Sequence, residues 1–537
     1  MQDSEGSEHR SPVAWRRRWA VVALVVAVLL VIIVRVRLLQ LPLERVEGEN
    51  AYAGQLLLEG IAPYKAAYDI NLPGTYACYA AIMAVFGETP AGIHLGFLLV
   101  NLATLVLLFF VARRLWDVPH AVVACITYAL LSMSKGVLGL EAHATHLVVL
   151  ATLGGLLLLL KARASACSWT FAWSGLAFGL AYLCKQPGIF FGLFGLVVLL
   201  HDVRVSPPPE RRGRFRRIGI FCAGLALPFL LTCLLMAWAG AFDRFWFWTM
   251  LYAYVHAGNR GWHEILRGLV DFDVKTGAVR WAGVVAVVGL VCLARDKASS
   301  ETRWIIIRLL VFSLIAFVVG FYFSQHSFIM MLPVVSLLIA FAVRRAVRAM
   351  GEVQPTGIFA AACAVFIFAN RVLWFEQTPE AASRDLYGGN AFTEAVTIAN
   401  YIRDHSSPTD TIAIMGSEPE IYFLAHRHSA SGYTYISDLM QSHRYALDMQ
   451  KEMMRQMEAA KPTFLLIVYV DTSWLIAKNS DLSITRWYKT FWDKYYDMAG
   501  MVWLLPDRTE YVWGPAASTK TFETDSRVRI LQRKPGL

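Results

Sequence analysis

Residues 44–79 carry the densest set of side chains that could do chemistry. Five carboxylates and five tyrosines are interleaved there: Glu44, Glu47, Glu49, Glu59 and Asp69, with Tyr52, Tyr64, Tyr68, Tyr76 and Tyr79. Long apolar runs flank the stretch. Charged groups held at a membrane face are costly, and they usually line a site or a water-filled cavity. The pattern therefore predicts a reaction centre at the surface of a membrane protein.

The composition places the whole chain in the membrane class. Of its 537 residues, 57% are hydrophobic and 17% are charged, whereas soluble domains have about 45–50% apolar and about 25% charged residues. The net charge is +10, but the basic residues occur in short blocks between apolar runs. A nucleic-acid partner would need a continuous basic face, so we expect none.

Apolar stretches of about 20 residues can span a bilayer as helices. Eleven candidates occur, at 17–38, 91–112, 119–137, 143–161, 168–184, 187–202, 217–240, 277–294, 304–324, 328–344 and 356–374. The segment 73–87 is shorter, and we expect it to lie at the interface or to re-enter the membrane. Residues 1–15 are predicted to be a disordered tail, and the first apolar run an uncleaved transmembrane helix.

Six basic segments test this set of spans. They are Arg16–Arg18, Arg113–Arg114, Lys161 with Arg163, 204–217, 295–303 and 344–348. With eleven spans all six fall on one side, and basic loops stay cytoplasmic. The opposite side then receives the first outer loop (39–90), 138–142, Lys185, 241–276, 324–326 and everything after 375. We therefore predict a multi-pass protein of a bacterial cytoplasmic membrane with a cytoplasmic N-terminus.

The region 376–537 has a different pattern and forms a second predicted domain after the membrane domain of 16–375. Apolar residues recur with helical spacing from Ala395 to Ile402, and a short apolar strand follows at 411–415. An amphipathic segment at 443–460 precedes a second strand at 464–470. Alternating helices and buried strands favour a small α/β domain with a parallel sheet, closed by strands within 501–515 and 526–534.

Six motifs in order resemble a known family. They are VEGENAYAGQLLLEGIAPY at 46–64, YDINLPGTYACYAAIMAVFG at 68–87, GLEAHATH at 139–146, GLAYLCKQPGIF at 179–190, SQHSFIMMLP at 324–333 and SEPEIYFLAHR at 417–427. Together they are similar to the GT-C glycosyltransferases, in particular the bacterial group related to protein O-mannosyltransferases and the lipid A aminoarabinose transferase. Two positions depart from that pattern, because Val46 replaces the usual Asp and Asn71 the usual Lys.

The resemblance implies a membrane enzyme of GT-C-like fold. It would move a hexosyl or pentosyl group from a polyprenyl-phosphate donor to an extracytoplasmic glycan, lipid or protein, with inversion and with a first-loop carboxylate as base. A transporter or flippase of lipid-linked saccharides remains an alternative, although no internal repeat is apparent. A catalytically silent scaffold is a third, which Val46 and Asn71 motivate. The sugar, the acceptor and the oligomeric state stay open.

Candidate site residues follow from the motifs and from side-chain chemistry. Glu47 is the first candidate for general base, and Glu49 is the second. Lys185 stands between two apolar runs, where a cation would stabilise the charge of a leaving phosphate. Further candidates for substrate binding are Tyr52, Lys65, Asn71, His143, His146, Arg260 and His326. We expect no cofactor, although Glu141, His143 and His146 leave a divalent metal open.

Overall fold

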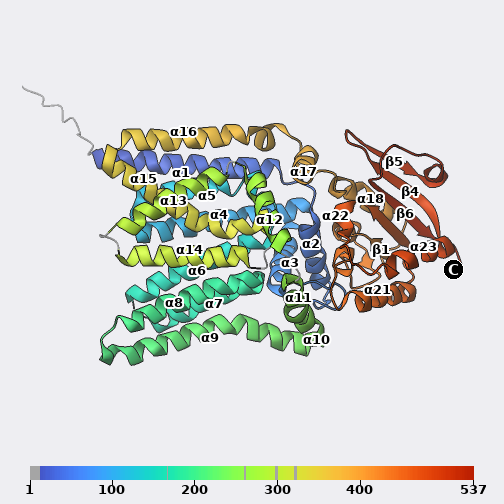
Figure 1. The fold of residues 1–537 in the computed structure, drawn as a ribbon, viewed down its shortest axis with the longest axis horizontal. Helices are drawn as coiled ribbons and strands as arrows, with labels where there is room; N and C mark the ends of the chain where they lie inside the picture. The colour runs from blue at the N-terminus through green and yellow to red at the C-terminus, as the bar shows by residue number, and fades with distance from the viewer. Residues whose placement is uncertain are drawn as a thin grey trace, which may run out of the picture.

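The structure, a computed structural model, describes residues 12–165, 167–258, 262–277, 279–296, 300–319 and 323–536. Helices lie side by side along the long axis of the molecule, and a domain with a β-sheet lies at one end of the bundle (Figure 1). Most of the predicted disordered tail, residues 1–11, lies outside the described residues. The last four residues of that tail already belong to the first helix, which begins at Pro12.

Although the helix within 119–137 ends at Leu131 and part of 304–324 lies outside the described residues, every predicted span overlaps a helix. These are α1 (Pro12–Arg37), α4 (Pro90–Leu115), α5 (Val118–Leu131), α6 (Ala144–Ser165), α7 (Ser168–Cys184), α8 (Ile189–Arg204), α9 (Pro208–Trp238), α13 (Val279–Arg295), α14 (Ser300–Val318), α15 (Leu332–Met350) and α16 (Val353–Ala369). Within the described ranges, six have the length and hydropathy to cross a membrane: α1, α4, α6 and α9, and α8 and α15 together with the turns before them. The protein is thus multi-pass, and the number eleven stays a prediction.

The basic segments that were predicted to share one side gather at one end of the bundle. A cavity there is lined by Arg114 at the end of α4, Arg163 at the end of α6 and Arg217 near the start of α9. The predicted outer segments meet at the other end, where Thr75 donates a hydrogen bond to the carbonyl of Cys184 at 2.6 Å. This arrangement matches the predicted alternation of the loops.

The first outer loop is largely helical. It contains α2 (Arg45–Leu58) and α3 (Pro73–Phe86), and 73–87 is the segment predicted to lie at the interface. Helix α2 starts at a capping box, in which the Glu44 side chain accepts from the Glu47 N–H and the Glu47 side chain accepts from the Glu44 N–H. Helix α3 starts at Pro73, whose fixed φ suits a first helical position.

Other short helices cover the same end of the bundle as α2 and α3. They are η1 (Lys135–Val137), η2 (Gln186–Gly188), α10 (Phe242–Trp246), the π-helical turn η3 (Phe247–Tyr252), α11 (Ala253–Gly258), α12 (Trp262–Thr276), η4 (Gln325–Met331), η5 (Val372–Glu376) and α17 (Pro379–Tyr387). Aromatic residues of α10 and η3 pack on the first outer loop, as in the stack of Trp248 on Tyr68. These residues therefore belong to a packed core.

The C-terminal domain contains one six-stranded sheet, in the order β2-β1-β3-β6-β4-β5. Its strands are β1 (Thr411–Met415), β2 (His428–Ser429), β3 (Phe464–Tyr469), β4 (Tyr496–Leu504), β5 (Thr509–Trp513) and β6 (Arg527–Arg533). Its helices are α18 (Phe392–Asp404), α19 (Glu420–Ala425), α20 (Ile436–Leu439), α21 (Ala446–Ala460), α22 (Asp471–Trp474), α23 (Ser483–Tyr495) and η6 (Gly514–Ser518).

The prediction of a parallel sheet is only half right. Strands β2, β1 and β3 are parallel, but β6 pairs antiparallel with both β3 and β4, and β5 pairs antiparallel with β4. The reason is the connection. The two parallel pairs are reached through helical crossovers, whereas β4 and β5 are joined by a short hairpin that forces antiparallel pairing.

The α/β domain and the first outer loop share one hydrophobic core. Tyr64, Tyr68 and Tyr76 of the loop cluster with Met415 and Tyr433 of the domain. The Tyr68 N–H donates to the carbonyl of Gly432 at 2.7 Å, and Tyr68 and Tyr433 form an isolated parallel bridge. The α/β domain is therefore built onto the loop.

Helix α2 approaches α19 of the α/β domain most closely at Gly48. A Cβ atom on Gly48 would lie 2.5 Å from the Glu420 Cβ and 2.6 Å from its backbone nitrogen. Backbone cannot retreat as a flexible side chain would. We expect Gly48→Ala to lower the free energy of unfolding by about 1–3 kcal/mol through overpacking, measured by thermal unfolding in detergent.

Gly219 of α9 is the matched control for this variant, because a Cβ there meets no atom within 4 Å. Gly219→Ala should cost nothing, since alanine is the better helix former. Equal melting temperatures for Gly48→Ala and the unmodified protein would contradict the close packing of α2 on α19.

Candidate functional site

Glu47 is the best-satisfied carboxylate of the first outer loop. Its side chain is fully buried. One oxygen accepts from the Glu44 N–H at 3.1 Å. The other accepts from the Ala142 N–H, and it lies 3.1 Å from Nε2 of His94 on α4. Glu47 thus ties the start of α2 to the loop before α6 and to α4.

The electrostatics of Glu47 agree with an anchoring role. Burial alone would raise the pKa of its carboxyl, but the His94 ring, His143 and the Ala142 N–H outweigh burial and lower that pKa. The neighbouring Glu44 has the opposite shift, because burial and the charge of Glu47 raise its pKa to about 8. The surroundings of the pair therefore favour the charge on Glu47 and the proton on Glu44.

Glu49 lies one half-turn further along α2 and faces the α/β domain. It is buried, and one of its oxygens accepts from the Thr434 hydroxyl at 3.2 Å. Burial raises the pKa of Glu49 well above its ordinary value, and the nearby carboxylates Asp69 and Asp438 raise it further. Three carboxylates thus face one another between the first outer loop and α20.

Asp69 is held by its own loop. Its two oxygens accept from the Ile70 N–H at 2.6 Å, the Asn71 side-chain amide at 2.5 Å and the Tyr76 hydroxyl at 2.8 Å. Burial raises the pKa of Asp69 despite these donors. Asn71 stands where the resembling family carries a lysine, and its role here is to orient Asp69.

Lys185 supplies a cation at the centre of the site. It stands between α7 and η2, where it interacts electrostatically with Asp69 on one side and Glu44 on the other. Burial lowers the pKa of its ammonium to about 8. Among the described residues, no side-chain hydrogen bond or ion pair involves this ammonium, so it is available to an anionic ligand.

Two histidines lie next to Lys185. The rings of His143 and His326 stack with their centroids 4.2 Å apart, and Lys185 acts electrostatically on both. Nδ1 of His143 lies 3.8 Å from Oε1 of Glu44. Burial lowers the pKa of His143 to about 4, so its ring is neutral at pH 7. The three residues come from three separate sequence motifs.

Tyr52 and Lys65 have other surroundings than this group, whereas His146 interacts electrostatically with His143 and His326. The Tyr52 hydroxyl accepts from the Ser429 N–H at 2.8 Å, which fixes α2 on the α/β domain. His146 is fully buried in the first turn of α6, beside Phe97. Lys65 is exposed, and Arg260 lies outside the described residues.

Sequence reasoning missed the residues that the α/β domain contributes. Thr434, Tyr435 and Asp438 surround Glu49 although they lie about 385 positions away in the chain. They belong to no motif and follow no periodic signal. Glu44 and Asp69 were noticed only as part of a charged stretch; their place on either side of Lys185 required the fold.

The carboxylates do not form a metal site in the structure as described. Within those residues, no three His, Cys, Asp or Glu side chains lie together in a way that could hold a metal ion. The group Glu141, His143 and His146 is therefore not such a site in the described part of the chain.

Comparisons with known proteins bear on the whole arrangement. A sequence family described as dolichyl-phosphate-mannose-protein mannosyltransferase matches residues 72–238. The structure of ArnT from Cupriavidus metallidurans bound to undecaprenyl phosphate matches 97% of this chain and 98% of that chain, with a TM-score of 0.56 and 13% identity. Its apo structure matches with 14% identity and the same TM-score, covering 96% and 98%.

A second fold neighbour is the archaeal oligosaccharyltransferase AglB from Archaeoglobus fulgidus, in complex with an inhibitory peptide and a dolichol-phosphate. It matches 94% of this chain and 75% of that chain, with a TM-score of 0.50 and 12% identity. The chain has the GT-C fold. The resemblance seen in the sequence is confirmed at this level. No curated protein sequence matches the chain.

Asp438 gives the site a pH dependence that can be measured. Burial, reinforced by Asp69, raises its pKa from the ordinary 3.8 to about 7. The folded protein keeps a proton that the unfolded chain releases, so this group's stabilising effect is complete below about pH 4 and is lost as the pH rises through about 7. We expect Asp438→Asn to flatten the fall in melting temperature between about pH 4.5 and about pH 8.

The exposed Asp448 of α21 provides the control. Asp448→Asn removes the same charge from the same domain, and it should leave the slope of melting temperature against pH as it is in the unmodified protein. A slope that Asp438→Asn does not change would contradict the burial of this carboxylate beside Asp69.

Proposed function

We propose that the protein is a membrane glycosyltransferase that moves a sugar from a polyprenyl-phosphate donor to a hydroxyl acceptor. The fold neighbours support this class: one is bound to undecaprenyl phosphate and another to a dolichol-phosphate. The matching sequence family is named for dolichyl-phosphate-mannose transfer. The sugar is hexosyl or pentosyl, and the acceptor is a glycan, a lipid or a protein.

One observation carries the proposal. The Lys185 ammonium interacts electrostatically both with the stacked rings of His143 and His326 and with the buried carboxylates Asp69 and Glu44. A glycosyl transfer from a lipid phosphate needs a cation to stabilise the leaving phosphate and a carboxylate to take the proton of the acceptor hydroxyl. Neither a channel lining nor a scaffold requires them side by side.

The reaction is a single displacement with inversion. The acceptor oxygen attacks the anomeric carbon and forms the new C–O bond, while the bond from that carbon to the phosphate oxygen breaks. The leaving group is the polyprenyl phosphate, which carries away the bonding electron pair. One carboxylate takes the proton of the acceptor hydroxyl, and no second acid is needed because a phosphate leaves as an anion.

Glu49 fits the role of base better than Glu47. Both oxygens of Glu47 are already engaged by protein groups, so neither is placed to accept a proton from a substrate hydroxyl. Glu49 accepts from the Thr434 hydroxyl at one oxygen, and Tyr435 is its other side-chain hydrogen-bond partner. Burial and the carboxylates Asp69 and Asp438 raise its pKa, which makes its ionised form the stronger proton acceptor of the two. Val46, in the family's Asp position, lies three residues before Glu49 and so on the same helix face.

Lys185 is proposed to bind the phosphate, with the two histidine rings beside it. The ammonium lies at the inner edge of the first outer loop, between α7 and η2, where a lipid in the bilayer would present its headgroup. The acceptor would approach from the α/β domain, whose Thr434 and Asp438 border the carboxylates. Basic loops at the far end of the bundle make that end cytoplasmic, so the reaction would take place outside the cytoplasm.

The base assignment is tested by two variants of one helix. We expect Glu49→Gln to fold normally and to lower turnover about 10²–10⁴-fold, as is typical for loss of general base catalysis. The assay uses purified protein with a polyprenyl-phosphate hexose. Glu47→Gln should instead lower the melting temperature, because an amide cannot accept from all the donors that now face the carboxylate.

Glu59 at the end of α2 is the control for both variants. It pairs with His428 at the exposed surface, and Glu59→Gln should alter neither turnover nor melting temperature appreciably. Wild-type turnover in Glu49→Gln would exclude Glu49 as the base. If Glu47→Gln kept full stability and lost turnover, the two roles would be exchanged.

The phosphate assignment is tested at Lys185. We expect Lys185→Met to lower kcat/KM about 10²–10³-fold, because the ammonium stabilises charge on the leaving phosphate. The variant should also lose affinity for the spent carrier, polyprenyl phosphate, as a product inhibitor. Lys65→Met, at the exposed lysine of the same outer surface, should have a much smaller effect. Equal losses in both variants would assign the effect to surface charge.

A further inference from the structure

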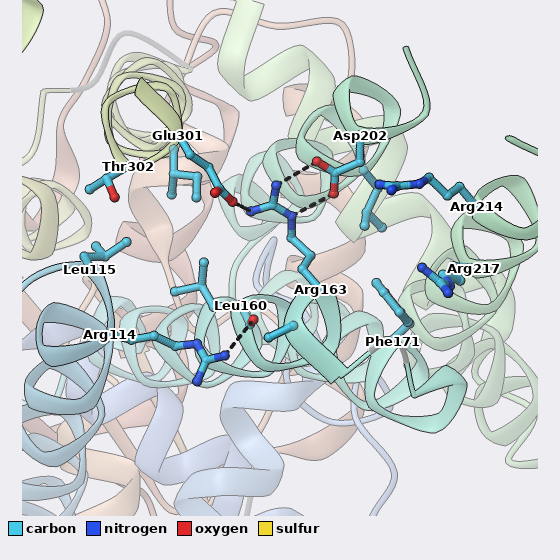
Figure 2. A pocket seen from close by; sticks show the side chains of 13 residues that line it. Arg114, Leu115, Leu160, Arg163, Phe171, Asp202, Arg214, Arg217, Glu301 and Thr302 are labelled. Carbon is cyan, nitrogen blue, oxygen red and sulfur yellow. Dashed lines mark hydrogen bonds and ion pairs between the residues drawn. The ribbon is translucent and has the colours of Figure 1, made fainter. Parts of the chain in front are cut away.

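The polar cavity among the basic helix ends lies at the opposite end of the bundle from the carboxylates. Its volume is about 370 Å³, within the roughly 300–1,000 Å³ typical of small-molecule sites. The ends of six helices line it, α4, α6, α7, α8, α9 and α14. Figure 2 shows the charged side chains from these helices arranged around it. None of the proposed glycosyl-transfer chemistry uses this cavity.

One arginine of the cavity is fully engaged by carboxylates. Arg163 of α6 makes two parallel hydrogen bonds to Asp202 of α8, both at 2.7 Å. A third nitrogen contacts Glu301 of α14 at 2.7 Å (Figure 2). This fork fixes the wall of the cavity and joins three helix ends, so the guanidinium has little capacity left for a ligand.

Two other arginines that line the cavity have no carboxylate partner. Arg114 donates only to the Leu160 carbonyl, at 3.3 Å. Arg217 lies over the Phe171 ring, with 5.8 Å from its guanidinium carbon to the ring centre. No ion pair involves either of them in the described ranges. Arg214 also lines the cavity, but it pairs with Glu210 at 3.0 Å. Arg114 and Arg217 are therefore the lining arginines that give the cavity its excess of positive charge.

The cavity lies at the depth of lipid headgroups. Trp169 and Trp173 of α7 flank Phe171, and Trp304 of α14 lies between the lining residues Thr302 and Ile305. All three tryptophans are exposed, at 77%, 59% and 45%. Exposed tryptophans at helix ends mark the boundary between hydrocarbon and headgroups.

We propose that this cavity binds the phosphate headgroup of an anionic phospholipid from the leaflet at this end of the bundle. Arg114 and Arg217 lie on opposite sides of the Arg163 fork (Figure 2), and either guanidinium would contact the phosphate oxygens in the bidentate manner that such groups favour. Basic pockets between transmembrane helices on the cytoplasmic side are suited to such headgroups. The acyl chains would lie along the apolar faces of α7 and α14.

A lipid in this position would stabilise the bundle. Apart from the ion pair of Arg163 with Glu301, few contacts join α6 directly to α14 at this end. A headgroup held in the cavity would add contacts between the helix ends that line it. The same phosphate chemistry could come from a soluble phosphate, but the bordering tryptophans favour a ligand that is anchored in the membrane.

The experiment measures lipid retention and thermal stability of the full-length protein in detergent. Phosphatidylglycerol, phosphatidylcholine and soluble glycerol 1-phosphate are added in parallel, and bound lipid is counted by native mass spectrometry. We expect phosphatidylglycerol alone to be retained and to raise the melting temperature. The double variant Arg114→Gln/Arg217→Gln should retain it roughly tenfold or more weakly.

The chain offers a closely matched control, because each of these arginines has an exposed arginine next to it in sequence. Arg113→Gln/Arg216→Gln removes the same charge from the same two helix ends without touching the cavity. It should retain phosphatidylglycerol as the unmodified protein does.

Three results would overturn the proposal. Equal weakening in both double variants would mean that a diffuse basic surface, and not the cavity, attracts the lipid. Equal stabilisation by glycerol 1-phosphate would assign the cavity to a soluble phosphate. Equal retention of phosphatidylcholine would show that the cavity does not distinguish an anionic headgroup from a zwitterionic one. None of these outcomes depends on transferase activity, so they are distinguishable from a failure of the function proposed above.

Discussion

The buried carboxylate of Glu47 is the interaction on which the outer end of the molecule depends. It accepts hydrogen bonds from the backbone N–H groups of Glu44 and Ala142, and it contacts the ring of His94. Removing one partner from a buried, hydrogen-bonded charge typically costs about 3–5 kcal/mol. These contacts fix the start of α2 relative to the loop before α6 and to helix α4. They therefore also fix the positions of the side chains further along α2.

Helix geometry then gives the two glutamates Glu47 and Glu49 different surroundings. Glu47 and Glu49 are two residues apart, so they cannot face the same way on a helix. Glu47 points into the bundle, and Glu49 points to Thr434 and the α/β domain. The carboxylate that resembles the family's motif most closely is therefore the one least able to exchange a proton with a substrate.

Sequence patterns predicted the parts of this structure that depend on local or one-dimensional signals. The spans followed from hydropathy, and strand β1 was placed at its observed residues because a short apolar run ends at a glycine. The charged blocks predicted which loops share an end of the bundle. The sheet was half wrong because the direction of the last three strands depends on a hairpin and on pairing across the domain.

The site itself was only partly accessible from sequence. Motif resemblance found Lys185, His143 and His326, which the fold does bring together. It also favoured Glu47 as the base. The donors around Glu47, which no motif records, are the reason that we propose Glu49 for that role. The partners of Glu49 could not be found, because contact between an early helix and a late loop leaves no local pattern.

The long distance in sequence between the first outer loop and its partners in the α/β domain has a consequence for biosynthesis. The first outer loop emerges early, yet Tyr68 pairs with Tyr433 and Glu49 is covered by Thr434 only once most of the polypeptide has been made. Until then Tyr68 and Glu49 lack the partners that the α/β domain supplies. Non-local contacts of this kind form late and slowly. A ribosome that stops before Tyr433 would release a chain whose first outer loop lacks these contacts, so completeness of translation is itself a checkpoint for this protein.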